Sequence, residues 1–369
     1  MGFQPVGGGV MEFIGLDDTP ASYAAQGRKT ARVNLAEDAI EFGPGFDTPI
    51  NPTIESTLIY GPAAPPGAWT DLDVGVGHCL AYIRMSGDCT LQFRRKGEVF
   101  DWEQGCGRMR AVVAEPYAYV VVLTDSAGLV QWKLAAGAGN VTLWRIAYWP
   151  EPPVPDIEIA TGINAPIVFT QLNTGIPNAL VLLHFSSGVA IPKNFMVQEY
   201  GETNDMDTAS GIAGCTCGAT PATYDGHVMM LTDSLGRLQW KVWFTPNVDY
   251  IIRLVAYIPC IVNQPKLLLY SGVNNSSATY QDIPTPFGRG FMLLKGLHTG
   301  GAATAVAFRE NGAAQGAYHG GPGVTCLELG AGFLSYVLVP LDTYGVAEWG
   351  DASGVGTTVD LTAVAISGG

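Results

Sequence analysis

Short runs of apolar residues, each followed by a turn sequence, recur along most of this chain. In one of them, residues 119–123 are all apolar, and the sequence Asp-Ser-Ala-Gly follows at 125–128. An Asp side chain accepts hydrogen bonds from nearby downstream amides, and Gly tolerates a positive φ, so these four residues predict a turn. Residues 130–134 then alternate apolar and polar side chains. We therefore predict a β-hairpin over residues 119–134.

The hairpin sequence occurs three times. The segment 123–133 returns at 231–241, where Asp233 follows Asp125 by 233 − 125 = 108 residues. A weaker third copy lies at 341–349, where 342 − 233 = 109. Three residue types keep their places in every copy: Asp125, Gly128 and Trp132; Asp233, Gly236 and Trp240; Asp342, Gly345 and Trp349. Self-similarity at a fixed period indicates tandem copies of one structural module.

Other landmarks recur at nearly the same period. An aromatic residue precedes an aliphatic one at Trp69 and Leu72, Phe169 and Leu172, and Tyr280 and Ile283. A strand-like segment ends in Gly at 93–97, 197–201 and 308–312, and a closing strand recurs at 145–150, 253–259 and 361–366. These landmarks predict three modules: residues 53–150, 156–260 and 265–369.

Each module is predicted to be a β-sandwich. About eight short strands fit into a module, and that length and spacing favour an antiparallel, jelly-roll-like sandwich. The chain is therefore expected to be all-β. Proline-rich linkers at 150–155 and 259–265 predict semi-rigid spacers, so we expect the modules to form a rigid stalk and head. Residues 1–52 form a separate N-terminal segment.

The composition limits the classes of partner and cofactor. The net charge is −14 and the chain has only 19 basic residues, so we expect no nucleic-acid partner. No apolar run approaches the ~18 residues that span a bilayer, so no membrane insertion is expected. The seven cysteines do not recur at matching positions, which favours reduced thiols over a disulfide framework. Cys215 and Cys217 lack the ligand set of a zinc site, and we expect neither a metal nor another cofactor.

The N-terminal segment carries a recognisable motif. Residues 14–42 are too few to bury a core of their own. The motif residues are Leu16, Asp18, Thr19, Pro20, Tyr23, Gly27, Lys29, Val33, Asn34, Ile40, Glu41 and Phe42. This pattern resembles a motif of tailed-bacteriophage fibre proteins, with two departures: Arg28 inserted into the Gly-Lys pair, and Ile40 in place of Leu. The resemblance covers residues 14–42 alone.

The resemblance implies a place and an assembly for the protein. Residues 1–52 would attach the chain to other virion proteins, and the downstream modules would form a homotrimer or bind a receptor on the host surface. The site residues implied by the motif are Leu16, Asp18, Thr19, Pro20, Tyr23, Val33, Asn34 and Phe42. The protein would be made in the bacterial host cytoplasm and end in the virion.

No catalytic residues are predicted. The five histidines match no metalloprotease pattern, and no Gly-x-Ser-x-Gly sequence occurs. Paired carboxylates for glycoside cleavage are present at Glu199, Glu202, Asp205 and Asp207, but their Gly- and Asn-rich surroundings favour a solvated loop. We therefore expect a protein that is not an enzyme.

Tryptophans offer candidate binding residues. Trp132, Trp240 and Trp349 recur at one module position, which favours a place in the core. Trp102 and Trp243 do not recur, so they are the better candidates for exposed aromatics that stack on sugar rings.

Together these patterns predict a virion appendage, a tail or head fibre or spike, that recognises a host glycan or protein without catalysis. Receptor contact is expected in module 3, and identical copies would raise the affinity through avidity. Two alternatives remain open. One is a purely structural capsid-decoration or tail component, and the other is a fibre-borne polysaccharide-degrading enzyme.

Overall fold

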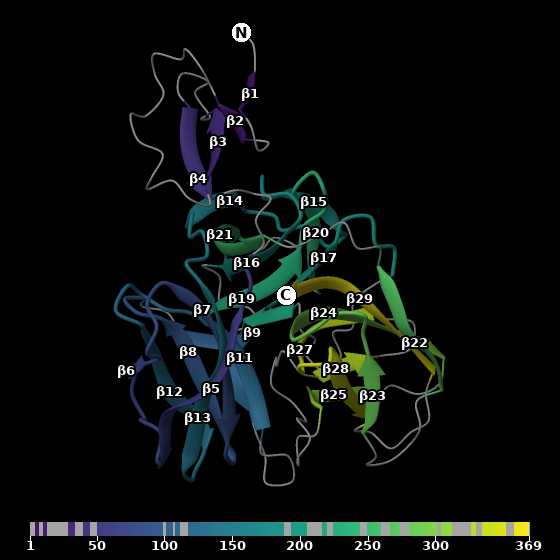
Figure 1. Ribbon diagram of the computed structural model, residues 1–369. Helices are drawn as coiled ribbons and strands as arrows, with labels where there is room; N and C mark the ends of the chain where they lie inside the picture. The colour runs from purple at the N-terminus through teal and green to yellow at the C-terminus, as the bar shows by residue number, and fades with distance from the viewer. Residues whose placement is uncertain are drawn as a thin grey trace. The chain divides into compact units, whose positions relative to one another are not determined.

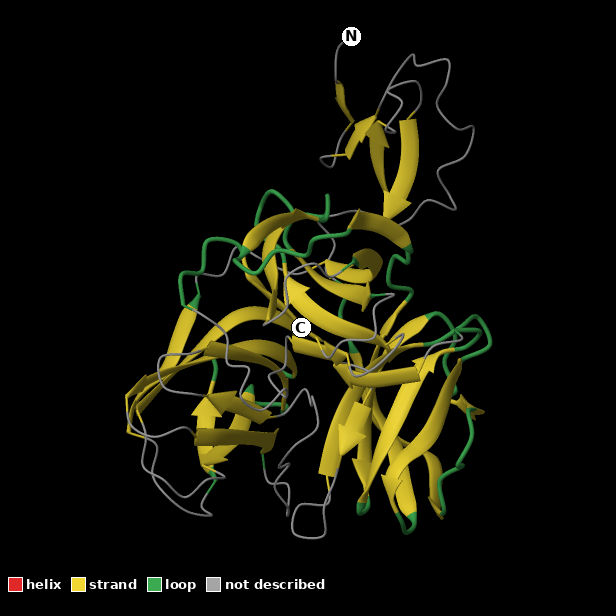
Figure 2. Ribbon diagram, turned by 180° about the vertical axis from the view of Figure 1, so that it is seen from behind, coloured by secondary structure: helices red, strands yellow, loops and turns green. Residues whose placement is uncertain are grey.

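The computed structural model describes most of the three modules and part of the N-terminal segment. The described residues are 4–6, 10–12, 29–33, 40–44, 50–98, 101–105, 108–110, 117–187, 193–204, 216–219, 224–243, 249–259, 266–273, 280–300, 304–311, 326–329, 334–351 and 358–368. All regular elements among these residues are β-strands, so the chain is all-β as predicted (Figure 2). The chain forms two compact units, Met1–Thr48 and Pro49–Gly369.

The N-terminal unit contains two short antiparallel pairs. Strand β1 (Gln4–Val6) pairs with β2 (Val10–Glu12), and β3 (Lys29–Val33) pairs with β4 (Ile40–Pro44). Five motif residues lie on these strands: Lys29 and Val33 on β3, and Ile40, Glu41 and Phe42 on β4. The other motif residues, Leu16, Asp18, Thr19, Pro20, Tyr23, Gly27 and Asn34, lie outside the described residues.

The larger unit contains six principal sheets, two in each predicted module range (Figure 1). Module 1 has one sheet of β11 (Tyr117–Leu123), β7 (Cys79–Ser86), β13 (Val141–Pro150) and β5 (Thr53–Ala63), and one of β10 (Arg108–Arg110), β8 (Cys89–Arg95), β12 (Leu129–Gly137) and β6 (Thr70–Asp73). The described strands of the other two modules repeat this plan.

Module 2 has one sheet of β14 (Ile157–Gly162), β21 (Tyr250–Pro259), β16 (Ala179–Ser186), β19 (Tyr224–Leu231) and β9 (Asp101–Gly105), and one of β15 (Thr170–Asn173), β20 (Arg237–Trp243), β17 (Lys193–Glu199) and β18 (Thr216–Ala219). Module 3 has one sheet of β22 (Leu267–Val273), β29 (Thr358–Gly368), β24 (Gly290–Gly300) and β27 (Leu334–Leu341), and one of β23 (Gln281–Pro284), β28 (Val346–Asp351), β25 (Thr304–Glu310) and β26 (Cys326–Leu329).

The strand order is that of a jelly roll in all three modules. We number the strands of each module from one to eight in chain order, leaving out β9. The order across one sheet is then first, eighth, third and sixth. The second strand lies beside the seventh, fourth and fifth in the other sheet. Two Greek keys folded into facing four-stranded sheets define a jelly roll. Strand β9 is the exception, since it follows β8 in the chain but pairs with β19 of module 2.

The repeated tryptophans lie inside the sandwiches, as their recurrence predicted. Trp132, Trp240 and Trp349 are each at most 2% exposed. In module 2, Trp240 packs against Phe195 and Tyr250, with ring centroids 6.4 and 4.7 Å away. Burying a large aromatic side chain stabilises a fold strongly, so these three positions anchor the cores.

The repeated turn has the predicted geometry. The Oδ1 atom of Asp125 accepts hydrogen bonds from the backbone amides of Ala127 and Leu129, at 2.9 and 2.8 Å. Asp233 and Asp342 accept the equivalent pairs of bonds, each between 2.8 and 2.9 Å long. Gly128 follows with φ = 80°, a conformation that other residues rarely adopt. The aspartates therefore close the hairpins through backbone hydrogen bonds.

Replacing Asp125 by Ala should lower the free energy of unfolding by roughly 1–3 kcal/mol, because two backbone amides lose their acceptor. Ser126→Ala in the same turn is the control, since Ser126 is exposed and should change stability by less than about 0.5 kcal/mol. Urea unfolding of both variants checks the prediction, and equal stability of the two would contradict it.

Candidate functional site

In one sheet of each module, a central strand (β7, β16 or β24) is buried on both faces. On β7, Cys79, Ala81 and Ile83 belong to the core of module 1, whereas Leu80 and Tyr82 point away from that core. Both outward residues are nevertheless fully buried. The equivalent outward residues of the other modules, Leu180 and Leu182 on β16 and Phe291 and Leu293 on β24, are at most 3% exposed. The modules therefore cover one another's sheets, whereas one face of an antiparallel sheet is commonly solvated.

The junction between modules 3 and 1 is aromatic. The Tyr82 hydroxyl donates a hydrogen bond to the backbone oxygen of Leu338, at 3.2 Å. The Phe291 ring lies 4.9 Å from the Tyr82 ring, nearly perpendicular to it, and 4.8 Å from Trp149. All three rings are at most 1% exposed. This cluster is packed as tightly as a domain core.

The junction between modules 1 and 2 contains ion pairs and a shared sheet. Arg95 of module 1 lies 2.9 Å from Asp156, which also lies 3.3 Å from Arg253 of module 2. Strand β9 extends the sheet of module 2 by pairing in parallel with β19. Main-chain pairing and charge pairing thus join these two modules.

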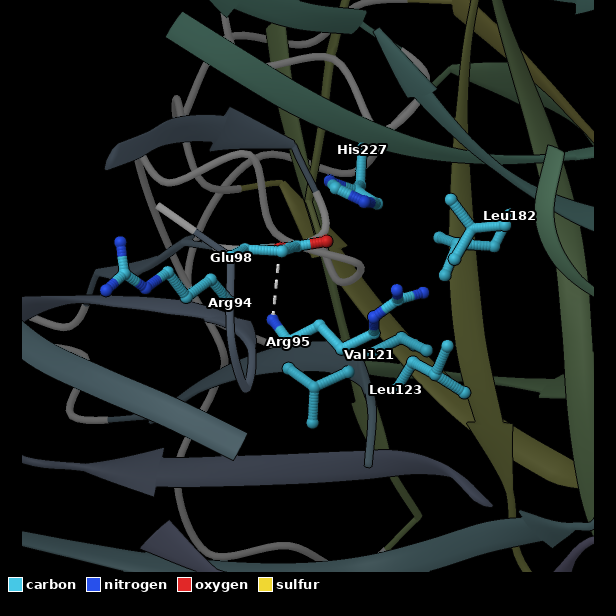
Figure 3. A pocket seen from close by; sticks show the side chains of 9 residues that line it. Arg94, Arg95, Glu98, Val121, Leu123, Leu182 and His227 are labelled. Carbon is cyan, nitrogen blue, oxygen red and sulfur yellow. Dashed lines mark hydrogen bonds between the residues drawn. The ribbon is translucent and has the colours of Figure 1, made fainter. Parts of the chain in front are cut away.

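Figure 3 shows a small cavity at this junction, lined by residues of both modules. Its volume of about 10 Å³ is room for about one water molecule. The lining residues include Arg95 and Glu98 from module 1 and Leu182 and His227 from module 2. The Arg95 amide donates a hydrogen bond to the Glu98 carboxylate, at 3.2 Å. The cavity is too small to bind an organic ligand.

His227 is buried at this junction. It is 1% exposed, and its ring stacks on the His184 ring with centroids 4.6 Å apart. Burial holds the pKa of His227 well below its ordinary value of 6.5, and the nearby His184 and Arg95 lower the pKa further. The imidazole is therefore neutral in the folded protein at neutral pH.

We expect the protein to lose stability as the pH falls below about 6.5. Below this pH the His227 side chain binds a proton in the unfolded chain but stays neutral in the folded chain. Protonation therefore favours unfolding until the pH reaches the lower pKa of His227 in the folded state. Thermal unfolding between pH 7.5 and 5 checks this. His227→Gln, which does not titrate, should flatten the pH dependence, and an unchanged slope in that variant would contradict the assignment. The titratable and charged groups that face this site with His227 are His184, on the paired strand, and Arg94, Arg95 and Glu98, which line the same cavity.

The junction between modules 2 and 3 uses two carboxylates of the acidic cluster. Glu199 is 6% exposed, and its carboxylate lies 2.9 Å from Lys266 Nζ and accepts a hydrogen bond of 3.2 Å from the Tyr336 hydroxyl. Glu202 lies 2.8 Å from Lys295 Nζ. Burial raises the pKa of Glu202, but hydrogen bonds from Lys295 and Asn204, with the positive charge of Lys295, lower it to about 2.

These two carboxylates therefore join module 2 to module 3, rather than lying in a solvated loop as predicted for the cluster. The remaining members, Asp205 and Asp207, lie outside the described residues.

An open pocket lies at the edge of module 1, with a volume of about 300 Å³. It is lined by Tyr60 of β5 and by the buried Leu72 and Trp132. Thr70, Asp71 and Asp73 of the exposed strand β6 also line it. Thr70 pairs with Trp132 and shares its face of the sheet, whereas the Asp71 carboxylate lies with Gln131 on the opposite face.

Neighbouring side chains hold the charged and aromatic residues around this pocket in place. Lys96 Nζ lies 2.7 Å from the Asp71 carboxylate and lowers the pKa of Asp71. The Tyr60 ring lies 4.6 Å from the Trp132 ring at 71°, and its hydroxyl donates to the Ala64 backbone oxygen at 2.6 Å. Aromatic rings beside a hydroxyl group at an exposed strand edge suit a polyhydroxylated ligand such as a sugar.

The structure places the predicted surface aromatics on strands. Trp102 lies on β9 and Trp243 on β20, and their side chains lie outside the described part of the chain. Sequence reasoning missed the pocket because Tyr60, Asp71 and Asp73 carry no motif. Only the recurring Leu72 and Trp132 marked this part of the module.

Two further properties concern metals and membranes. Within the described ranges, no group of three or more His, Cys, Asp and Glu side chains is placed to hold a metal ion. The same residues include no helix with the length and apolar character needed to cross a bilayer.

Comparison with known proteins yields one weak similarity. No protein-family model matches the chain, and no curated protein matches it. Among solved structures, the chain is similar to one chain of the "X-ray structure of the entire lipid-containing bacteriophage PM2", at 10% identity, covering 85% of this chain and 100% of that chain. The TM-score of 0.15 is too low to indicate a common fold.

Proposed function

We propose that the protein is a structural and binding component of a bacteriophage virion: a tail or head fibre or spike that recognises the host surface without catalysis. Residues 1–52 attach it to other virion proteins, and the three jelly rolls form the exposed body. The observation that carries the proposal is the mutual packing of three jelly rolls in one chain, preceded by the fibre-like motif at 14–42.

The fold supports this proposal by analogy. Jelly rolls are common in viral capsid proteins and in lectins, which are structural and sugar-binding proteins respectively. A fold alone does not determine function, so the binding role rests on the module 1 pocket. Its Tyr60 ring and the Thr70 hydroxyl, at the edge strand β6, fit a host-surface glycan. Trp102 and Trp243 remain candidates for additional contacts, and the proposed host contact moves from module 3 to module 1.

Blocking the pocket tests the recognition role. Thr70 is exposed on β6, and Thr70→Arg places a long side chain across the pocket without removing a core residue. Thr170→Arg is the matched control, because Thr170 pairs with Trp240 as Thr70 pairs with Trp132. On an array of bacterial capsule and lipopolysaccharide sugars, Thr70→Arg should weaken binding about tenfold or more, a loss of the size expected for a displaced aromatic contact. Equal binding by both variants, or none by the unaltered protein, would exclude the pocket.

A purely structural role is the second candidate, and an exposed apolar segment favours it. Ile163, Ile167 and Val168 are between 56% and 76% exposed on one loop of module 2. Exposed apolar side chains close together in sequence often mark a contact with another protein. A neighbouring virion protein would cover this loop in the particle. Protection of residues 163–168 from surface labelling in virions, with the module 1 pocket unable to bind sugar, would favour this role.

Homotrimerisation, which the fibre resemblance implies, is proposed for the whole chain through residues 1–52. Light scattering of the full chain measures it directly, and a monodisperse single-chain mass would exclude it.

A further inference from the structure

The junctions between modules 1 and 2 and between modules 2 and 3 use the same surface of the sandwich. Strand β8 places Arg95 opposite Val130, and β17 places Glu199 opposite Leu238. Val130 and Leu238 occupy the same position of the repeated hairpin, 108 residues apart. Arg95 and Glu199 are therefore equivalent residues, each at the turn that contacts the next module.

The partners of these residues are also equivalent. Asp156 directly precedes β14, which begins by pairing Ile157 with Leu254. Lys266 directly precedes β22, which begins by pairing Leu267 with Ala363. Leu254 and Ala363 pair in turn with Leu183 and Leu294, which hold the same place on β16 and β24.

The two equivalent ion pairs have opposite polarity. At the first junction the turn carries the cation, Arg95, and the next module carries the anion, Asp156, at 2.9 Å. At the second junction the turn carries the anion, Glu199, and the next module carries the cation, Lys266, also at 2.9 Å. The Glu199 side chain is only 8% exposed, so solvent screens its charge poorly.

We infer that this reversal of charge specifies the order of the modules. If the turn of module 1 met module 3, Arg95 would face Lys266. If the turn of module 2 met module 2 of another copy, Glu199 would face Asp156. Only Glu199 is well buried, since the Arg95, Asp156 and Lys266 side chains are 31%, 34% and 54% exposed. Like charges in contact still oppose association, so each incorrect pairing is disfavoured while each correct pairing is stabilised.

In a chain of three similar modules, this reversal of charge would keep one copy from joining another through the same surfaces. A surface that joins one module to the next, head to tail, either closes or continues from copy to copy into open assemblies. The third junction differs again. Thr57 pairs with Arg145, which pairs with Ile83, so the residue equivalent to Asp156 and Lys266 is the uncharged Ser56. The contacts at this junction are aromatic. The residue equivalent to Arg95 in module 3 is Glu310, whose side chain lies outside the described part of the chain.

The proposal goes beyond the virion role and concerns the isolated protein. Its test is a polarity swap at the second junction of the full chain. All variants carry Tyr336→Phe, so that the tyrosine hydroxyl bond to Glu199 is absent throughout. Lys266→Glu alone places two carboxylates together and should lower the melting temperature by about 5 °C. Adding Glu199→Lys should restore most of that loss, because the swapped pair has the polarity of the first junction.

The swapped variant also tests specificity, since both junctions then have the same polarity. On refolding from denaturant, its turn Lys at position 199 can pair with Asp156 of another copy. We expect a several-fold larger oligomeric fraction by light scattering than for the Tyr336→Phe parent. Lys96→Glu with Asp71→Lys is the matched control, because that pair lies within module 1. It should refold as cleanly as the parent.

Three results would overturn the proposal: no loss of stability in Lys266→Glu, no recovery in the swap, or clean refolding of the swapped variant. If Lys266→Glu does not fold, Lys266→Gln replaces it as the milder single variant. Its melting temperature should be lower than that of the Tyr336→Phe parent. A melting temperature equal to that of the parent would likewise overturn the proposal.

Discussion

Trp240→Ala should lower the free energy of unfolding by about 3–5 kcal/mol, among the largest effects of any single substitution in this chain. The Trp240 ring is 2% exposed and lies between aromatic neighbours on both sides, Phe195 and Tyr250. Its loss opens a cavity in the middle of module 2 that rigid sheets cannot refill. Urea unfolding followed by circular dichroism measures the change.

The matched control is Tyr344→Ala in the repeated turn of module 3. The Tyr344 side chain is 82% exposed, so its removal should change stability by less than about 0.5 kcal/mol. If Trp240→Ala were as mild as this control, the placement of the repeated tryptophan in the core would be wrong.

Phe291→Ala should be similarly severe, at about 3–5 kcal/mol, although Phe291 points away from the core of its own module. The ring fills the space between Tyr82 and Trp149 of module 1. The variant should also increase hydrogen exchange on the outer surface of the module 1 sheet, at β7 and β13, and not only in module 3. That spread distinguishes a shared junction from a local core defect.

Leu268→Ala is the control for this variant, because Leu268 lies on β22 of the same module but is 57% exposed. An equally small effect of Phe291→Ala, or exchange confined to module 3, would show that modules 1 and 3 do not share a core in solution.

The fold within each module could be predicted because its signals are local. The Asp-to-Gly turn fixes a hairpin, and the recurring Trp marks its buried face at every copy. The position of the tyrosine that packs on each repeated tryptophan could not be predicted. Tyr60 and Tyr270 pack on the tryptophans of modules 1 and 3 from the first strand, whereas in module 2 Tyr250 does so from the last strand.

Gly162 explains how module 2 tolerates that exchange. A Cβ atom at this position would lie 2.9 Å from the Tyr250 hydroxyl oxygen, so only Gly leaves room for the ring. A contact between strands that are distant in sequence leaves no periodic trace, and a single sequence therefore does not reveal it.

The arrangement of the modules was predicted incorrectly. The proline-rich linkers suggested a stalk, but all three pairs of modules are in contact. The sequence did contain the relevant signal, because residues 79–83, 179–183 and 291–294 are continuous apolar runs without alternation. Such runs are typical of strands that are buried on both faces. The candidate site depended on this arrangement, since Glu199 and His227 acquire their partners only at the junctions.

Immunogold electron microscopy of intact phage particles, with antibody against residues 49–369, tests the central claim most directly. The account predicts gold at the tips of tail or head appendages of undisrupted particles, because the three-module body is exposed and residues 1–52 attach it. Particles that carry no gold before or after disruption, with the protein left entirely in the infected-cell lysate, would contradict a virion role.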